Sequence, residues 1–533
     1  MIGKIVANMA TTKTTDLSEA AIQARYITNF YPKEAATQEM SLVSSDWKEG
    51  DFAVVVNLLK RYGAGPIEVD GTVTVDGEPA QYMGLGVYSK VFSGGATAAK
   101  TVRISTSSGQ VAEFQVAPPK PLKLVSVNGA KSDAAIDMTK DLTLGFDGAG
   151  EKDSFIRVAL VAEGLGMRNF SDIGIYKLGK TVKIPAAAFR HPSLQSNASA
   201  RLEGRTTKSS VEEKDSIILS GPNTLLVERF ETKTLNAPAA GAVEGISQGW
   251  AWMRVNVSGK VPTIFKIETA GAKGGIEYNA EKPNASTGKP LVEAKKLAII
   301  SLTVYGALIR ATESQLGAAG LGDVTTTTKT FIFPRVPVAY WDNTLENIHD
   351  GLSKMLKTQF GSTVISTDKV LAAKTYGELA PITEVDTDHN ITHAYKGLKI
   401  LSVSQGDVKR VTATFADDRT ETRLMRELGV DGLVEATVHF GLTDAKTLTT
   451  TTTINYRIIG GPNGYQSNTS YAQGQVTDVA GKNFSAGQFK TEDSLGTVIP
   501  VNELISAIGH ALSEQEAKAK ELGYHAIWNM QEN

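Results

Sequence analysis

The sequence predicts a multi-domain protein in which N-terminal all-β, immunoglobulin-like sandwiches are followed by a C-terminal α/β domain. Three observations lead to this prediction. The chain has 533 residues, which is more than a single hydrophobic core usually supports. Before residue 295, glycine-punctuated alternation of apolar and polar residues, rich in Thr and Val, predicts short strands joined by tight turns. After residue 295, apolar residues at helical spacing alternate with strand patterns.

The first predicted unit is a β-sandwich module over residues 1–118. Residues 52–59 form an apolar run that suits a strand buried on both faces. Residues 71–77 alternate and end in an Asp-Gly turn. Residues 101–106 and 110–116 alternate on either side of a Ser-Ser-Gly turn, so we expect them to form a hairpin.

The second predicted unit is an immunoglobulin-like sandwich over residues 119–235. Prolines at 118, 119 and 121 form the clearest linker, since consecutive prolines favour extended backbone and cannot lie in a central strand. Its expected strands cover residues 122–128, 142–146, 155–161, 180–184 and 225–230. Residues 236–295 then predict a small β extension or linker, with one alternating strand at 250–257.

The C-terminal α/β domain is predicted over residues 296–533. An apolar strand at 296–305 is followed by a helix at 343–360, for which Asn343 and Glu346 form a capping box. A second helix is expected at 417–428, capped by Asp417 and ended by Gly429.

Strands and one more helix complete this predicted domain. Residues 433–440 and 449–459 are expected to form a hairpin, and residues 476–484 a further short strand pair around Gly481. Pro500 then introduces a last amphipathic helix. A core should therefore close within a fragment that begins near residue 295.

Composition narrows the classes of function. Lys and Arg total 55 and Asp and Glu total 57, so the net charge is −2 and no basic stripe for nucleic acid is present. The chain has no cysteine, which excludes disulfides, thiolate metal sites and cysteine nucleophiles. No signal-peptide core is recognisable in residues 1–15, and no apolar run reaches the ~18–20 residues of a membrane span.

Four stretches carry a family resemblance: residues 295–302, 426–434, 476–482 and, further upstream, 124–129. The first three resemble bacterial envelope domains related to the curli-secretion lipoprotein and to the N-terminal domain of TolB. The fourth is similar to the start of immunoglobulin-like modules in envelope lipoproteins of Bacteroidota-type bacteria. The resemblance implies an exported, non-enzymatic scaffold or assembly component. Such families usually carry a signal segment and often a lipidated Cys, which this sequence does not show, so membrane attachment stays open.

Three patterns resemble catalytic or phosphate-binding motifs. Gly245, Ser247 and Gly249 match the G-x-S-x-G nucleophile elbow, but a strand follows the serine where the elbow needs a helix, so a Gly-rich turn is favoured. Ser45 and Lys48 have S-x-x-K spacing without a helical frame or a Lys-Thr-Gly strand. Residues 317–322 are glycine-rich but lack the G-x-G-x-x-G order. We therefore expect no catalytic residue and no cofactor.

The best cluster of metal-ligand residue types lies in residues 384–393. Asp386, Asp388, His389 and His393 supply carboxylate and imidazole groups of the kind that bind metals. The EF-hand order of ligands is not kept, and two histidines four residues apart suit zinc only on a helix. These four residues are weak metal candidates, and a solvated acidic loop is the default interpretation.

Aromatic pairs offer an alternative. Trp250 and Trp252 share a strand face, and Tyr340 and Trp341 precede a helix. Exposed aromatic rings stack on sugars, whereas aromatic residues of sandwiches usually pack in the core. His439 falls on the strand face opposite its apolar neighbours, which is an ordinary position for a half-buried histidine.

Two functional hypotheses follow. The first is a non-catalytic structural or assembly component of a bacterial cell envelope, in the periplasm, outer membrane or cell surface. Its partners would be other envelope proteins or further copies of this chain, and not nucleic acid. The alternative is a surface adhesin or glycan-binding accessory protein, which requires Trp250, Trp252 or Trp341 to be exposed together in a groove. For self-association, the uncharged, β-branched residues 447–453 predict an open edge strand.

Overall fold

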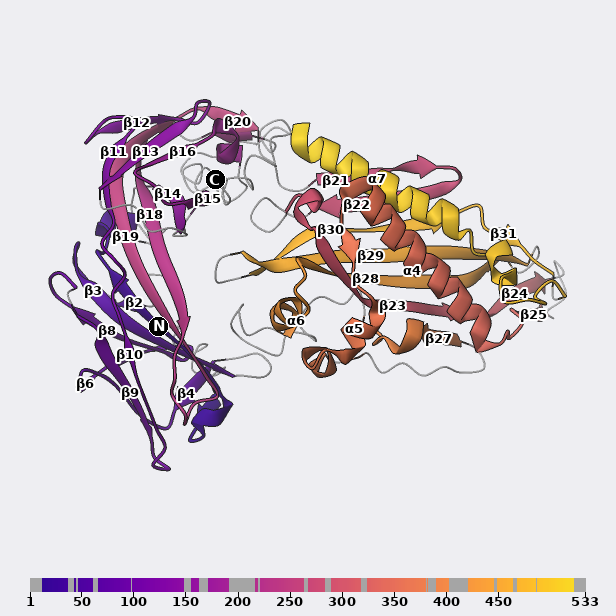
Figure 1. Cartoon of the computed structure of the whole chain (residues 1–533), viewed down its shortest axis with the longest axis horizontal. Coiled ribbons are helices and arrows are strands. Elements are labelled where there is room, and N and C mark those ends of the chain that lie inside the picture. Colours follow the sequence, from indigo (N-terminus) through magenta and orange to yellow (C-terminus); the bar gives the residue numbers. More distant parts are fainter. Residues whose placement is uncertain are drawn as a thin grey trace.

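The computed structural model describes residues 12–36, 43–44, 47–60, 66–96, 98–147, 155–162, 171–190, 216–218, 221–262, 267–282, 289–317, 324–379, 381, 390–401, 420–444, 448–463, 467–485 and 487–521. The fold class predicted from the sequence is confirmed. An all-β part is followed along the chain by an α/β part (Figure 1).

The all-β part is built around a nine-stranded sheet. Its order is β15-β14-β18-β19-β2-β3-β8-β7, and β12 also pairs with β19. The strands are β2 (Ala20–Thr28), β3 (Phe52–Lys60), β7 (Gln81–Gly84), β8 (Val87–Phe92), β12 (Ala134–Asp137), β14 (Phe155–Ala162), β15 (Ser171–Lys177), β18 (Gly221–Thr234) and β19 (Ala242–Ser258). The long strand β19 pairs with β2 over residues 242–249 and with β12 over residues 255–258, so it runs the length of the sheet.

Two smaller sheets pack on this large one and enclose separate hydrophobic cores. The first holds β5 (Gly71–Val75), β6 (Glu78–Pro79), β9 (Lys100–Thr106) and β10 (Val111–Val116). The second holds β11 (Lys123–Val127), β13 (Leu142–Asp147) and β16 (Thr181–Ile184). Val54, Val102 and Ile104 are buried in the first core, and Leu144 and Val227 in the second. Two short pairs lie beside these sheets, β1 (Thr12–Thr14) with β4 (Ile67–Val69) and β17 (Ser216–Ile218) with β20 (Lys260–Pro262).

The strand pairing revises the predicted modules. The predicted hairpin is present as β9 and β10, with Val102 opposite Phe114. However, the two sandwiches share one sheet across the predicted boundary at residue 118, because β19 pairs with β2. The expected small β extension at 236–295 is divided, since β19 belongs to this sheet and later strands join the C-terminal one. A proline linker shows where the chain leaves a sheet, but it does not show which distant strands pair.

The C-terminal sheet has the order β21-β22-β30-β29-β28-β23-β26, with β27 beside β23 and β31 beside β29. The strands are β21 (Ile267–Lys273), β22 (Ile276–Lys282), β23 (Lys296–Ala307), β26 (Thr363–Val364), β27 (Asn390–Ala394), β28 (Gly432–Asp444), β29 (Thr449–Asn463), β30 (Ser467–Asp478) and β31 (Lys482–Asn483). Strand β23 is parallel to β28 and β26. Strands β28, β29 and β30 form an antiparallel meander, and β22 pairs antiparallel with β30.

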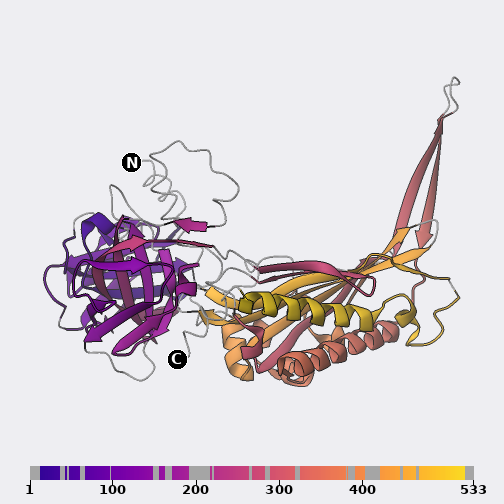
Figure 2. The ribbon, with the colours of Figure 1, turned by 90° about the horizontal axis from the view of Figure 1, so that it is seen from above.

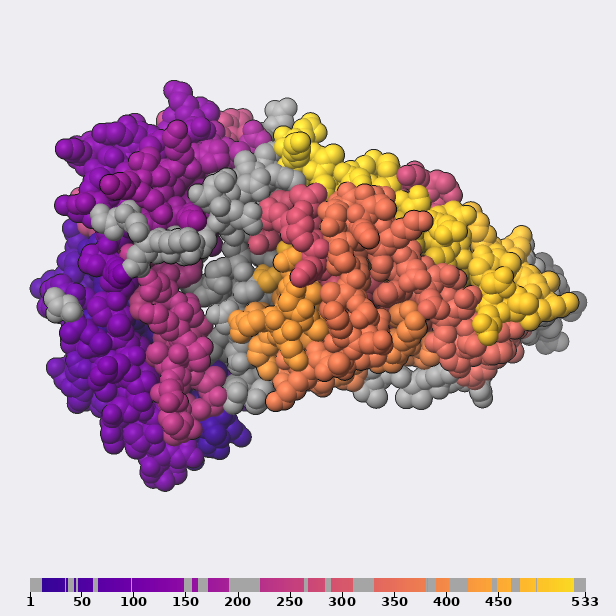
Figure 3. Space-filling view, in the orientation of Figure 1, coloured from indigo at the N-terminus to yellow at the C-terminus, as the bar shows by residue number. Residues whose placement is uncertain are grey.

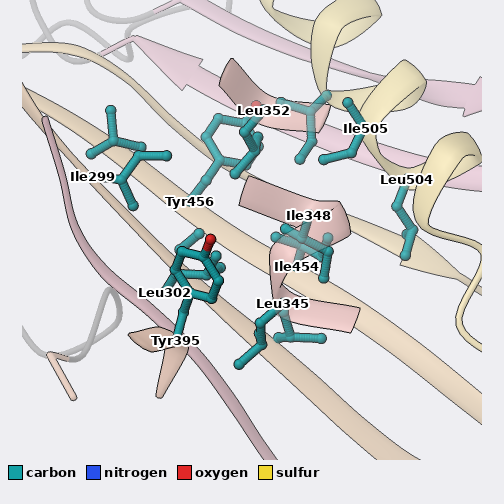
Figure 4. Close-up of a cluster of buried hydrophobic side chains, with 14 of the residues drawn as sticks. Ile299, Leu302, Leu345, Ile348, Leu352, Tyr395, Ile454, Tyr456, Leu504 and Ile505 are labelled. Carbon is teal, nitrogen blue, oxygen red and sulfur yellow. The ribbon is translucent and has the colours of Figure 1, made fainter. Parts of the chain in front are cut away.

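Helices α4 (Val338–Phe360) and α7 (Val501–Glu521) lie side by side on one side of this sheet (Figures 1, 2 and 3). Their apolar stripes face the strands, as Figure 4 shows for Leu345, Ile348 and Leu352 of α4 and Leu504 and Ile505 of α7. Two shorter helices, α5 (Thr367–Ala372) and α6 (Thr420–Leu428), pack near β23 and near β28 and β29. Among the described helices, none has a stretch long and apolar enough to cross a membrane.

The observed helix ends agree in part with those predicted from the sequence. Gly429 ends α6 with a positive φ of 63°, as predicted, while Asp417 lies outside the described residues. The predicted start of α4 at Asn343 is wrong, because the helix begins at Val338 after Pro337. Proline fixes the backbone angle that a helix start needs, so it begins the helix a turn earlier. Asn343 instead donates a hydrogen bond to the Glu492 carbonyl at 3.1 Å.

Two further strand predictions are corrected. Residues 476–484 do not form a strand pair, because β30 and β31 both pair with β29. Of the residues predicted as an open edge, 447–453, Thr449–Thr453 fall on β29. This strand lies between β28 on one side and β30 and β31 on the other. Because β29 already has a paired strand along each of its two edges, the prediction of β-augmentation at Thr449–Thr453 is wrong.

Strands β24 (Ile309–Gly317) and β25 (Val324–Ile332) form a separate two-stranded ribbon between β23 and α4. Nine residue pairs are in antiparallel register, from Ile309 opposite Ile332 to Gly317 opposite Val324. Figure 2 shows this ribbon projecting away from the rest of the C-terminal part. We refer to it below as the arm.

Candidate binding surface

Ser247 lies in the middle of β19, a continuous strand between β2 and β18, where it is opposite Tyr26 and Glu231. Its hydroxyl donates a hydrogen bond to the Ala117 carbonyl at 2.7 Å. A nucleophile elbow needs a sharp turn from strand to helix, which this position does not have. The expected Gly-rich turn is also wrong. A Cβ on Gly245 would lie 2.7 Å from the Leu235 side chain and one on Gly249 would lie 2.8 Å from Pro119, so the glycines allow close packing.

The metal candidates are only partly visible. Asp386, Asp388 and His389 lie outside the described residues, as do Ser45 and residues 318–322 of the glycine cluster. His393 is on β27, and its Nε2 lies 2.8 Å from Oδ1 of Asp342 on α4. Within the described ranges, no three His, Asp or Glu side chains gather as a metal site.

The tryptophans do not form an exposed platform. Trp250 is 1% exposed and packs on Tyr31 and Phe30, with ring centroids 4.6 and 5.7 Å away. Trp341 is 2% exposed and packs on Phe440 in the core of the C-terminal part. Trp252 is half-buried and packs against the same core as Trp250. Since two of the three rings are buried in different cores, the tryptophans are not exposed together, and the sugar-stacking interpretation is wrong.

A polar network holds the strands of the all-β sheet together. Arg157 on β14 makes two hydrogen bonds to Asp172 on β15, at 2.5 and 2.9 Å, and reaches Glu228 on β18 at 3.4 Å. Glu228 is 3% exposed and also accepts a hydrogen bond from Gln248 on β19 at 2.8 Å. Because these buried and half-buried groups bond one another, we interpret the network as structural.

The C-terminal sheet carries a regular polar surface on the face of β22, β30 and β29 that is opposite to its apolar core residues. Cross-strand neighbours share a face, and Asn455, Gln475 and Asn279 are directly opposite one another on β29, β30 and β22. We call these three residues the amide row. The adjacent row contains Thr453, Thr477 and Glu277 on the same strands. The two threonine hydroxyls are hydrogen-bonded to each other at 2.9 Å.

A groove of about 630 Å³ lies at the outer end of the amide row. Nine residues line it: Ala270, Gly271, Ala272, Glu277, Tyr278, Asn279, Gln475, Thr477 and Val479. Three of them are small residues of β21, so the hollow forms where side chains are short. Tyr278 donates a 2.5 Å hydrogen bond to Glu514 of α7, and this carboxylate raises the pKa of the Tyr278 hydroxyl. This hydrogen bond connects β22, the middle strand of the groove, to helix α7.

No sequence motif marks the amide row. The usable signal is the alternation in β22, where Ile276, Tyr278 and Ala280 are buried while Glu277 and Asn279 are exposed. That pattern predicts one solvent-facing side of a strand. It does not predict which strands lie beside it.

Comparisons with known proteins give this chain no family. No family model matches the sequence, and no curated protein matches it. Among solved structures, the chain is similar to SGBP-B of the mixed-linkage glucan utilization locus of Bacteroides ovatus, in complex with a mixed-linkage heptasaccharide. The identity is 9%, the match covers 58% of this chain and 81% of that one, and the TM-score is 0.10. That score is far below the value of a shared fold, so the likeness assigns neither a fold nor a ligand.

Proposed function

We propose that this protein is a non-catalytic assembly component of a bacterial cell envelope or cell surface that acts through contacts with other proteins. The observation that carries the proposal is the arm formed by β24 and β25. An isolated two-stranded ribbon is only marginally stable in water, and its two outer edges present unpaired backbone groups. Among the described strands, none pairs with the arm.

The sequence of the arm supports the same proposal. Natural edge strands usually carry Lys, Pro or other charges that prevent pairing with a second chain. Here the four outermost residue pairs of the arm, residues 314–317 opposite residues 324–327, contain no charged residue and no proline. Residues 324–328 are also β-branched throughout, which favours an extended strand. The arm therefore has the properties of a strand pair that another protein completes.

The non-catalytic part of the proposal is supported by the position of Ser247 within a strand. The envelope location is supported by the family resemblance of the four stretches described above. Fractionation of the producing bacterium tests the location directly. Recovery of the protein in the cytosol alone would contradict it.

Removal of the arm tests the assembly role. Ile309 and Ile332 are opposite in register, so an Asn-Gly turn can replace residues 310–331 without moving either end. We expect the shortened chain to keep its cooperative melt. After cross-linking in the producing bacterium, the intact chain should be recovered in a larger assembly, and the shortened chain should not. The matched control is Val292→Lys, at a 41% exposed position away from the arm, which should keep the assembly. Recovery of the arm-deleted chain in the same cross-linked assembly as the intact chain would overturn the proposal.

A further inference from the structure

The groove beside the amide row has hydrogen-bonding groups that the protein itself does not use. Asn279 and Gln475 are exposed, and Asn455 is half-buried. Within the described residues, no side-chain hydrogen bond joins any of these three amides to another residue. Each amide offers two N–H donors and one acceptor oxygen. The row therefore presents six donors and three acceptor oxygens toward solvent.

These groups are held at fixed spacing. The three amides lie on adjacent strands, which are about 4.8 Å apart in a sheet. Helix α7 packs on β22 and β30 from the other side. It also holds the edge strand β21, since Thr269 donates to the Ala511 carbonyl at 3.4 Å and Lys518 to the Glu268 carbonyl at 2.9 Å. Groups on a rigid sheet lose little conformational entropy when a ligand binds.

The charge around the groove selects among ligand classes. Glu277 is the charged residue among those that line it, and Glu281 follows four residues later on the same strand. Anionic ligands such as nucleic acid, acidic glycans or lipid headgroups would be repelled by these carboxylates. A protein partner usually needs aromatic or Arg anchors, and among the residues that line the groove Val479 is the one large apolar side chain that is exposed.

From this arrangement we infer that the groove over β21, β22 and β30 binds a neutral, polyhydroxylated chain, a glycan without charged groups. Sugar hydroxyls both donate and accept hydrogen bonds, which matches the free amides and the nearby threonine hydroxyls. The small residues Ala270 and Ala272 leave room for a sugar ring beside Asn279. The regular strand spacing suits successive sugars of an extended chain. This inference rests on the groove and is independent of the arm.

The test measures binding of the full chain to maltohexaose, cellohexaose, laminarihexaose and mannohexaose, with heparin as an anionic probe, by calorimetry. We expect at least one neutral hexasaccharide to bind and heparin not to bind. Asn279→Ala and Gln475→Ala should each weaken binding about tenfold, the effect of losing about one hydrogen bond to the ligand. Lys273→Ala, an exposed change at the end of β21, is the matched control and should leave the affinity unchanged.

Several outcomes would overturn the inference. One is that none of the four neutral hexasaccharides binds, or that heparin alone does. Another is that binding is the same in the wild type and in the Asn279→Ala and Gln475→Ala variants while all melt alike. A third is that these variants lower the mass of an assembly in light scattering, which would make the groove a protein interface. The arm-deleted chain should still bind the sugar, so failure of the arm proposal and failure of this one are distinguishable.

Discussion

The buried ion pair between Lys282 and Glu516 allows a quantitative test of how the C-terminal part is held together. Lys282 on β22 is fully buried, and its Nζ donates hydrogen bonds to Glu516 of α7 and, at 2.6 Å, to the Lys289 carbonyl. Replacing Lys282 by Met keeps the side-chain volume but leaves the Glu516 carboxylate buried without its cation. Breaking a buried pair in this way costs about 3–5 kcal/mol of unfolding free energy.

The matched variant removes both charges. Lys282→Met combined with Glu516→Leu should recover most of the loss, because a buried pair replaced by apolar residues is often neutral or stabilising. At about 2–4 °C per kcal/mol for a part of this size, the single variant should melt roughly 6–20 °C lower than the wild type. Differential scanning calorimetry measures both variants. A single variant that melts within ~1 °C of the wild type, or a double variant no better than the single one, would refute the reasoning.

The same pair predicts the sign of a pH dependence. Burial lowers the pKa of Lys282 below its ordinary value of 10.5, although the Glu516 carboxylate opposes this shift. Between the lowered folded value and 10.5, the unfolded chain binds more protons than the folded one, so stability rises with pH. The unfolding free energy of the wild type, minus that of the double variant, should therefore increase as pH approaches 10.5. A difference that decreases over this range would show that the pKa of Lys282 is not lowered.

Three further substitutions have defined outcomes. Trp250→Ala should cost about 3–5 kcal/mol, because it empties a core position against Tyr31, and a denaturant melt measures it. Gly306→Ala should cost about 1–3 kcal/mol, since its Cβ would meet the Phe440 carbonyl oxygen of the neighbouring parallel strand, and a change within error of zero would contradict this. Ser247→Ala should leave every measurable activity unchanged and lower stability by less than about 1.5 kcal/mol, whereas labelling of Ser247 by a fluorophosphonate probe would contradict the non-catalytic interpretation.

Local periodicity predicted those elements that depend on neighbouring residues. The hairpin of β9 and β10 and the helix α7 were expected from alternation at period two and from helical spacing, and both are present. These patterns are short-range because each records which side of one element faces the core. The start of α4 was missed because Pro337 begins the helix outside the apolar stripe.

The arrangement of the strands could not be predicted in the same way. Strand β19 pairs with β2, from which it is separated by more than 200 residues, and no local pattern shows such a partner. The amide row could not be predicted for the same reason. Asn279, Gln475 and Asn455 are ordinary exposed positions on three strands, and only the order β22-β30-β29 makes them neighbours. The candidate binding surface is thus a property of the topology and not of a sequence motif.

The position of β21 and β22 changes what is expected of a separate C-terminal fragment. The sequence alone predicts that a fragment beginning near residue 295 folds by itself. In the structure, however, β22 pairs with β30 and α7 packs on β21 and β22, so a fragment of residues 296–533 loses one side of its sheet. It also loses Ile276 and Tyr278 from the core.

We therefore expect a fragment of residues 263–533 to melt cooperatively and the shorter one to be less stable. Burial of Ile276 contributes about 1.5–3 kcal/mol, which at about 2–4 °C per kcal/mol lowers the melting temperature by roughly 3–12 °C, before other losses are counted. The shorter fragment should also aggregate at lower concentration, because β30 becomes an open edge. Thermal melts and light scattering of both fragments measure these effects. Equal melting temperatures would show that β21 and β22 add nothing to the core, and a longer fragment without a cooperative melt would show that the C-terminal part does not fold alone.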